Sequence, residues 1–182
     1  MSTADPSHTG GLAGTSETPA YQNPGPYDGA EMWRLARDSQ TLDLNSPYMY
    51  LLGASHFADT SVIARVGGRT VGFVFGYRRP DAPDTLFVWQ VAVDAEHRGK
   101  RIGHGMLAAL VDRLKPRYLE ASVTPDNAAS AALFTGFARA NGVPVENREV
   151  LFTASHFPAG TTHHAEVLFR IGPFDPATKG RT

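Results

Sequence analysis

The chain has 182 residues, no cysteine and a formal net charge of −1 at pH 7, and each of these values excludes some classes of protein. The absence of cysteine excludes disulfides, thiolate metal sites and an acyl-cysteine intermediate. The balanced charge lacks the basic excess of nucleic-acid-binding proteins, and no apolar run is long enough to span a bilayer. We therefore expect a globular, cytoplasmic protein without nucleic acid or membrane partners.

The two ends of the chain differ in composition from its centre. Residues 1–27 are dominated by Ser, Thr, Gly, Ala and Pro, with one Asp and one Glu as the charged residues. Such a segment buries too little apolar surface to offset its ordering entropy, so we expect a disordered tail. The sequence predicts one folded domain over residues 28–175 and a flexible C-terminus over residues 176–182.

Two helices are expected at the start of this domain. Asp28 and Glu31 have the spacing of a capping box, with Asp in place of Ser or Thr, and apolar residues then recur on one helical face. The pair Ser46-Pro47 is a second start signal, because Ser favours the cap position and Pro the first turn. The second helix is predicted over residues 48–52.

The segments that follow predict a mixed sheet. A hairpin is expected from strands at 61–66 and 70–77, because Gly67-Gly68 supplies the positive φ angles of a tight turn. The nearly continuous apolar run at 86–93 is typical of a strand covered on both faces. The remaining elements are a helix at 103–115, a strand at 118–123, a helix at 127–140 and strands at 150–157 and 165–171. This order predicts an α/β (α+β) fold with a mixed, mostly antiparallel sheet of about six to seven strands and about four flanking helices.

The most informative segment runs from Arg98 to Gly105, between the apolar strand and the helix after it. It contains three glycines and three Lys or Arg residues, and it leads directly into the predicted helix. Glycine allows backbone N–H groups to approach an anion closely, and a helix N-terminus carries about half a positive charge. The segment therefore suits a pyrophosphate.

Three interpretations of this segment compete. A plain, solvated turn needs no ligand. A dinucleotide fingerprint fits the letters Gly103-His-Gly105-Met-Leu-Ala108, but about nine residues separate it from the strand, and the upstream chain is a hairpin instead of a βαβ unit. A nucleotide P-loop is excluded outright, because Arg101 stands where Ser or Thr is required. The third interpretation is an acetyl-coenzyme A loop.

The segment Arg98-Gly-Lys-Arg-Ile-Gly-His-Gly105 resembles the Arg/Gln-x-x-Gly-x-Gly/Ala loop of the GCN5-related N-acetyltransferases (GNAT). A second family element follows in the expected order: a strand, Asn127, and an alanine-rich helix that ends Leu133-Phe-Thr-Gly-Phe137. The resemblance implies the GNAT fold, with a sheet splayed at a cleft for the co-substrate acetyl-coenzyme A, and no metal. It also implies a strand bulge that aims a backbone N–H at the thioester oxygen, and direct attack by the amine.

The resemblance implies which residues contact acetyl-coenzyme A. They are Val91, Val93, Arg98, Gly99, Lys100, Arg101, Gly103, His104, Gly105, Asn127, Ser130 and Phe134. One of them departs from the family pattern, because many relatives carry a tyrosine at the position of Phe134, where it protonates the departing thiolate. Either another group acts as the general acid, or coenzyme A leaves as the thiolate.

Further segments resemble a narrower family, the L-2,4-diaminobutyrate acetyltransferases of ectoine biosynthesis. They include Leu42-Asp-Leu-Asn-Ser46, Phe87-Val-Trp-Gln-Val91 and Leu168-Phe-Arg-Ile-Gly172, and the resemblance spans residues 27–174. It implies acetylation of the 4-amino group of diaminobutyrate, on the route to the osmolyte ectoine, by a homodimer. The alternatives are a GNAT enzyme for another amine and a non-catalytic acetyl-coenzyme A sensor.

A substrate with two ammonium groups and one carboxylate requires acidic and hydrogen-bonding groups. Asp43, Asn45, Ser46 and Tyr48 cluster at the start of the second helix and are the candidate substrate contacts, with Trp89 as a wall or cation–π partner. Ser46 can equally be a simple helix cap, and Trp89 a core residue.

A base must take a proton from the ammonium before the amine attacks. The catalytic candidates are Asp43, His163, His164 and Glu166. Strand alternation puts His164 and Glu166 on one face of the last strand and His163 on the other. The same alternation puts the side chain after Trp89, Gln90, on the opposite face, so that a direct role for both is not expected.

Overall fold

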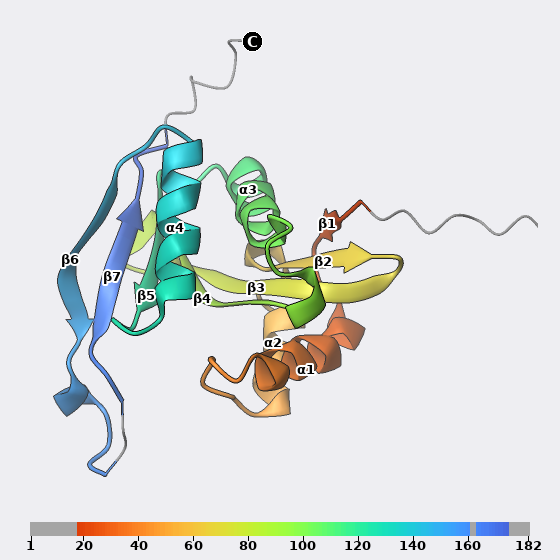
Figure 1. Cartoon of the computed structure of the whole chain (residues 1–182), viewed down its shortest axis with the longest axis horizontal. Coiled ribbons are helices and arrows are strands. Elements are labelled where there is room, and N and C mark those ends of the chain that lie inside the picture. The colour runs from red at the N-terminus through yellow and green to blue at the C-terminus, as the bar shows by residue number, and fades with distance from the viewer. Residues whose placement is uncertain (1–17, 161–162, 175–182) are drawn as a thin grey trace, which may run out of the picture.

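The chain folds around a seven-stranded mixed sheet with the strand order β1-β2-β3-β4-β5-β7-β6 (Figure 1). This computed structural model describes residues 18–160 and 163–174. The strands are β1 (Ala20–Gln22), β2 (Val62–Val66), β3 (Arg69–Arg79), β4 (Ala82–Val93), β5 (Tyr118–Val123), β6 (Val145–Phe152) and β7 (Glu166–Ile171). The helices are α1 (Gly29–Ser39), α2 (Pro47–Ser55), α3 (Ile102–Leu114) and α4 (Ala128–Ala140). Because β4 and β5 are parallel and the other pairs described are antiparallel, the predicted fold class is confirmed.

Two hydrophobic cores lie on opposite faces of this sheet. α3 and α4 cover one face, and α1 and α2 cover the other (Figure 1). Successive residues of β3 alternate between the cores, since Phe73 and Phe75 pack under α1 and α2 while Val74 packs under the other pair. None of the described helices is both long and apolar enough to cross a bilayer.

The hairpin is confirmed, whereas one later strand was misplaced. The turn between β2 and β3 has Gly67 at φ 57° and Gly68 at φ 81°, as a tight hairpin requires. The strand predicted at 150–157 is instead β6, which ends at Phe152. The strand cannot continue, because Ala154–His156 form a 3-10 turn in which the Thr153 N–H donates to Nδ1 of His156 at 3.1 Å.

The predicted N-terminal tail was too long. Residues 20–22 form β1, an edge strand that pairs with β2, so ordered structure begins upstream of Asp28. Strand pairing uses backbone groups and needs no apolar composition, which explains why composition did not reveal this strand. Residues 1–17 and 176–182, the rest of the two predicted flexible ends, lie outside the described residues.

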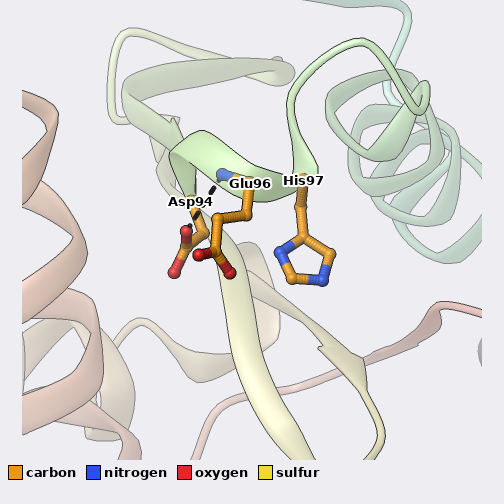
Figure 2. A group of neighbouring side chains, drawn as sticks. All are labelled: Asp94, Glu96 and His97. Carbon is orange, nitrogen blue, oxygen red and sulfur yellow. Dashed lines mark hydrogen bonds between the residues drawn. The ribbon is translucent and has the colours of Figure 1, made fainter.

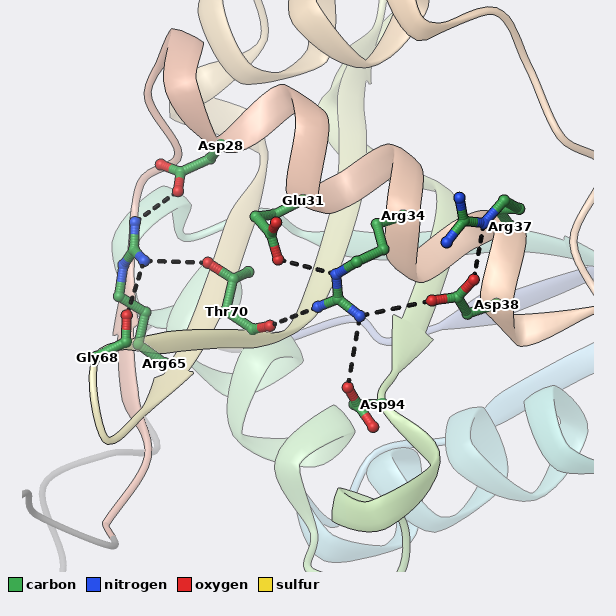
Figure 3. Close-up of polar contacts among 9 residues, drawn as sticks. All are labelled: Asp28, Glu31, Arg34, Arg37, Asp38, Arg65, Gly68, Thr70 and Asp94. Atoms are coloured by element: carbon green, nitrogen blue, oxygen red, sulfur yellow. Dashed lines mark hydrogen bonds and ion pairs between the residues drawn. The ribbon is translucent and has the colours of Figure 1, made fainter.

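The predicted capping box at the start of α1 was also wrong. Asp28 occupies the cap position but makes no side-chain cap hydrogen bond. Its carboxylate instead accepts a hydrogen bond from the Gly25 N–H at 2.9 Å. The same carboxylate pairs with Arg65 at 2.5 Å (Figure 3). Asp28 therefore ties α1 to β2.

The sheet splays between β4 and β5. These strands pair from Thr85 with Tyr118 to Val88 with Ala121, and β4 then continues to Val93 paired only with β3. The splay begins at a bulge, because Phe75 on β3 pairs with Gln90 and the next residue, Gly76, pairs with Val88. Trp89 is thus the extra residue of a β-bulge at the mouth of the splay.

Candidate active site

A cleft of about 490 Å³ opens at the splayed end of β4. Its walls are the end of β4, the loop that follows, the first turn of α3 and the start of α4. Nine of the twelve predicted cofactor-binding residues line it: Val91, Val93, Arg98, Gly99, Arg101, Gly103, His104, Asn127 and Ser130. Ser39, at the end of α1, adds a further wall together with Thr41 and Leu42 of the loop that follows, and sequence reasoning missed this wall.

The loop before α3 has the geometry of an anion site. Gly99 has a φ of +77° and open space where a Cβ atom would lie, so its backbone can be approached closely. Arg101 occupies the cap position of α3 at φ 60° without a side-chain cap hydrogen bond. The first N–H groups of α3 therefore have no side-chain cap. They lie at a helix end that carries partial positive charge, and Arg98 and Arg101 are close to them in the sequence. These residues fit the diphosphate of coenzyme A.

Three predicted cofactor residues lie apart from this lining. Lys100 is exposed and does not line the cleft. Gly105 faces β1, and a Cβ atom there would overlap the ring and hydroxyl of Tyr21. Phe134 is 2% exposed and lies in the core, near Phe169. Gly105 therefore leaves room for the Tyr21 ring, and the Phe134 side chain packs in the core.

His104 lies on the cleft wall near the second family element. Its imidazole contacts the ring of Phe137 and lies beside the backbone of Gly136. Burial lowers the pKa of His104, the positive charge of Arg101 lowers it further, and the backbone hydrogen bond at Gly136 opposes these effects. The imidazole is thereby favoured in its neutral form at this wall.

The bulge brings Trp89 and Gln90 to the same side of the sheet, against the predicted alternation. Trp89 packs edge-on against Phe75, at 5.0 Å between ring centroids, and remains 37% exposed. Gln90 is paired with Phe75 and donates from Nε2 to the backbone oxygen of Asp43 at 2.8 Å. Two successive side chains on one face are the expected result of a bulge, which interrupts the period of two.

The predicted catalytic residues Asp43 and His163 meet, although they lie far apart in the sequence. Oδ2 of Asp43 lies 3.8 Å from Nδ1 of His163, and the imidazole stacks on Phe157 at 4.4 Å between ring centroids. Asp43 stays accessible, with 82% of its side chain exposed. An acidic and a basic group from two separate loops thus face one another at the protein surface.

The remaining substrate candidates surround Asp43. Asn45 donates its side-chain amide to the Asp43 backbone oxygen at 3.3 Å. Ser46 precedes α2, but its hydroxyl makes no cap hydrogen bond, so capping does not explain this residue. The side chain of Tyr48 is 67% exposed on α2.

His164 and Glu166 occupy different positions from those predicted. β7 begins only at Glu166, so strand alternation does not apply to the two histidines before it. His164 is exposed and contributes to the lowered pKa of Asp126, after the larger effects of hydrogen bonds from Thr124 and from the Asp126 backbone. Glu166 is half-buried and pairs with Phe152 of β6.

A polar network around Arg34 borders the site. Arg34 of α1 donates to Glu31 at 2.9 Å and to the Thr70 backbone oxygen at 3.2 Å, and lies 3.6 Å from both Asp38 and Asp94 (Figure 3). This network joins the end of α1 to the turn that enters the phosphate loop.

In the same turn, the ligand atoms of Asp94, Glu96 and His97 lie within 4.8 Å of one another (Figure 2). Asp94, however, already accepts a hydrogen bond from the Glu96 N–H at 3.3 Å and faces the cation of Arg34. Turn capping therefore explains the cluster better than a metal centre does.

Comparison with known proteins identifies the class. The model of the acetyltransferase (GNAT) family matches residues 29–137, which is more than half of the chain. The chain belongs to this family of acetyltransferases.

Individual members of the family can also be compared with this chain. The chain is 54% identical to L-2,4-diaminobutyric acid acetyltransferase of Streptomyces coelicolor, over 80% of this chain and 88% of that protein. It is 42% identical to the Marinococcus halophilus protein of the same name, over 90% and 95% of the two chains. Among solved structures, diaminobutyrate acetyltransferase EctA from Paenibacillus lautus, in complex with L-2,4-diaminobutyric acid and coenzyme A, matches with a TM-score of 0.82 and 44% identity, over 89% of this chain and 98% of that one. Ard1 from Thermoplasma volcanium, with a TM-score of 0.68 and 14% identity, shares the fold.

Proposed function

We propose that this chain transfers the acetyl group of acetyl-coenzyme A to the 4-amino group of L-2,4-diaminobutyrate. The product, N4-acetyl-2,4-diaminobutyrate, would serve the synthesis of the compatible solute ectoine. The observation that carries the proposal is the Asp43–His163 pair, because the Asp43 backbone is hydrogen-bonded to Gln90, next to the Trp89 bulge where the sheet splays. An accessible carboxylate and imidazole suit a small substrate with two ammonium groups.

The splayed strand holds the reacting groups in place. From Trp89 to Val93, β4 has no β5 partner, so backbone groups that face β5 are open to the cleft. Such groups bind the pantetheine arm, and an N–H at the bulge stabilises the negative charge that develops on the thioester oxygen. Acetyl-coenzyme A supplies a reactive thioester, which a neutral amine attacks once the two are held in contact.

The amine must first lose a proton. His163 is the candidate base in this pair, because its imidazole lies 3.8 Å from the carboxylate of Asp43, the proposed partner of the substrate ammonium. Asp43 also offers an anionic partner for a substrate ammonium. Glu166 is a second candidate base at the start of β7. Asn45, Ser46 and Tyr48 complete the substrate wall beside Asp43, and Trp89 provides an apolar or cation–π surface.

A thiol-release assay tests this function. The enzyme receives acetyl-coenzyme A with diaminobutyrate, ornithine, lysine or spermidine, and we expect the highest kcat/KM for diaminobutyrate. Mass spectrometry of the product should place the acetyl group on the 4-amino nitrogen. If diaminobutyrate reacts no faster than the other amines, the substrate assignment fails; if no amine reacts, the non-catalytic sensor becomes the better explanation.

We also propose a cytoplasmic homodimer. Large apolar side chains are exposed on the surface of α2 and β6, including Tyr48, Leu51, Val150 and Phe152. Light scattering of the purified protein at several concentrations should give twice the chain mass, and a monomer at all concentrations would refute the dimer.

A further inference from the structure

Gln90 is a buried polar residue to which the mechanism above gives no role. The residue is 5% exposed, and its Nε2 donates to the backbone oxygen of Asp43 at 2.8 Å. We propose that Gln90 is a positioning residue for the amine substrate, because it fixes the backbone of Asp43 and thereby the place of the Asp43 carboxylate. This inference rests on the proposed function of Asp43.

The position of the Asp43 backbone depends on a contact from outside its own loop. It lies in the loop between α1 and α2, its side chain is 82% exposed, and the next residue, Leu44, is 47% exposed. Among the described residues, the amides of Gln90 and Asn45 both donate to the Asp43 carbonyl. Asn45 belongs to the same loop and moves with it, whereas Gln90 belongs to the central strand β4. Gln90 therefore sets the position of the loop relative to the sheet.

The orientation of the Gln90 amide is fixed by this contact. A carbonyl oxygen only accepts hydrogen bonds, so Nε2 must face Asp43 and Oε1 must point elsewhere. Oε1 is buried and has no hydrogen-bond partner among the described residues. A buried amide oxygen without a donor destabilises a fold, so packing alone would favour an apolar side chain here. A residue that breaks this rule is expected at a functional site.

The variant Gln90→Met separates positioning from packing, because Met has a similar length and neither donates nor accepts. We expect the KM for diaminobutyrate to rise about tenfold, equivalent to about 1.4 kcal/mol. The Kd for acetyl-coenzyme A should change less than about twofold, and the Tm should stay the same or rise, because the unpaired oxygen is gone. The matched variant Gln90→Glu places a carboxylate against the Asp43 carbonyl and should raise the KM while lowering the Tm. A Gln90→Met enzyme with a lower Tm and an unchanged amine KM would overturn the inference.

A double-mutant cycle tests whether Gln90 acts through Asp43. If it does, Asp43→Ala combined with Gln90→Met should raise the amine KM no further than Asp43→Ala alone. Independent, multiplicative increases would show that Gln90 acts in another way. An unchanged KM in Asp43→Ala would refute the proposed role of Asp43 itself, and with it this inference. A raised KM in Asp43→Ala with no effect of Gln90→Met would refute the inference alone.

Discussion

Oδ2 of Asp43 lies 3.8 Å from Nδ1 of His163, so one contact joins the loop after α1 to the segment before β7. The stacking of His163 on Phe157, with 13° between the ring planes, orients the imidazole. Both residues stand outside the helices and strands, and the Asp43 backbone oxygen accepts a hydrogen bond from Gln90 of β4. An acid and a base are thereby brought together, and we propose that the amine substrate binds beside them.

Replacement of Asp43 should weaken the amine site selectively. In Asp43→Ala, we expect the KM for diaminobutyrate to rise about tenfold or more, because a charge-assisted contact with the ammonium is lost. The Kd for acetyl-coenzyme A, measured by calorimetry, should stay nearly unchanged. Asp112→Ala is a matched control, since Asp112 is also an exposed acid but pairs with Lys115 at the C-terminal end of α3. Equal loss of amine and coenzyme binding in Asp43→Ala would contradict the assignment.

The two adjacent histidines should behave differently. His163→Gln removes the proposed base and should lower kcat by about 100-fold, the smaller end of what general base catalysis contributes. His164 is exposed and lies toward Asp126, so His164→Gln should keep most of the activity. Steady-state rates at saturating acetyl-coenzyme A provide the comparison. If the two variants lose activity equally, or if Glu166→Gln loses more than His163→Gln, the base must be reassigned.

The phosphate loop was predictable from sequence because its residues are consecutive. A strand, a short loop and a helix start bring Arg98, Gly99 and Gly103 together without tertiary information, and the structure puts them on one wall. The wall formed by Ser39, Thr41 and Leu42 depends on how α1 packs across the sheet, and no local pattern encodes that packing. Gln90 was misplaced because a bulge adds one residue and changes the face of the side chains around it. Asp43 and His163 were each chosen on chemistry, but only the fold brings them together.

Protonation of His104 should contribute to the loss of stability of the fold at acidic pH. The unfolded chain protonates a histidine near pH 6.5, whereas native His104, whose pKa is lowered mainly by burial, takes up its proton only at a lower pH. Stability is therefore lost as the pH falls from about 6.5 through the native pKa, and above that range His104 has no effect. His104→Gln should show a smaller drop in Tm between about pH 7.5 and pH 5 than the parent does. The exposed His56 supplies the matched control, His56→Gln. An identical drop in Tm for the parent and His104→Gln would refute this account.

Gly105 should be needed for packing and not for binding the cofactor. A Cβ atom at this position would overlap the end of the Tyr21 side chain, so in Gly105→Ala the ring must turn away or β1 must move from α3. Overpacking of this kind costs about 1–3 kcal/mol, which for a domain of this size lowers the Tm by roughly 2–4 °C per kcal/mol. At Gly103 the new Cβ would meet only the flexible end of Leu133 at 3.1 Å, so Gly103→Ala should lose less stability.

The double variant Tyr21→Ala, Gly105→Ala separates the two possible roles of this glycine. If the clash with Tyr21 is the cause, Gly105→Ala should cost little further stability once Tyr21 is truncated, since residues in contact are not additive. Binding of acetyl-coenzyme A to the double variant should then match binding to Tyr21→Ala alone, because Gly105 does not line the cleft. A loss of coenzyme affinity that follows Gly105→Ala in both backgrounds would show that the glycine serves the phosphate loop after all.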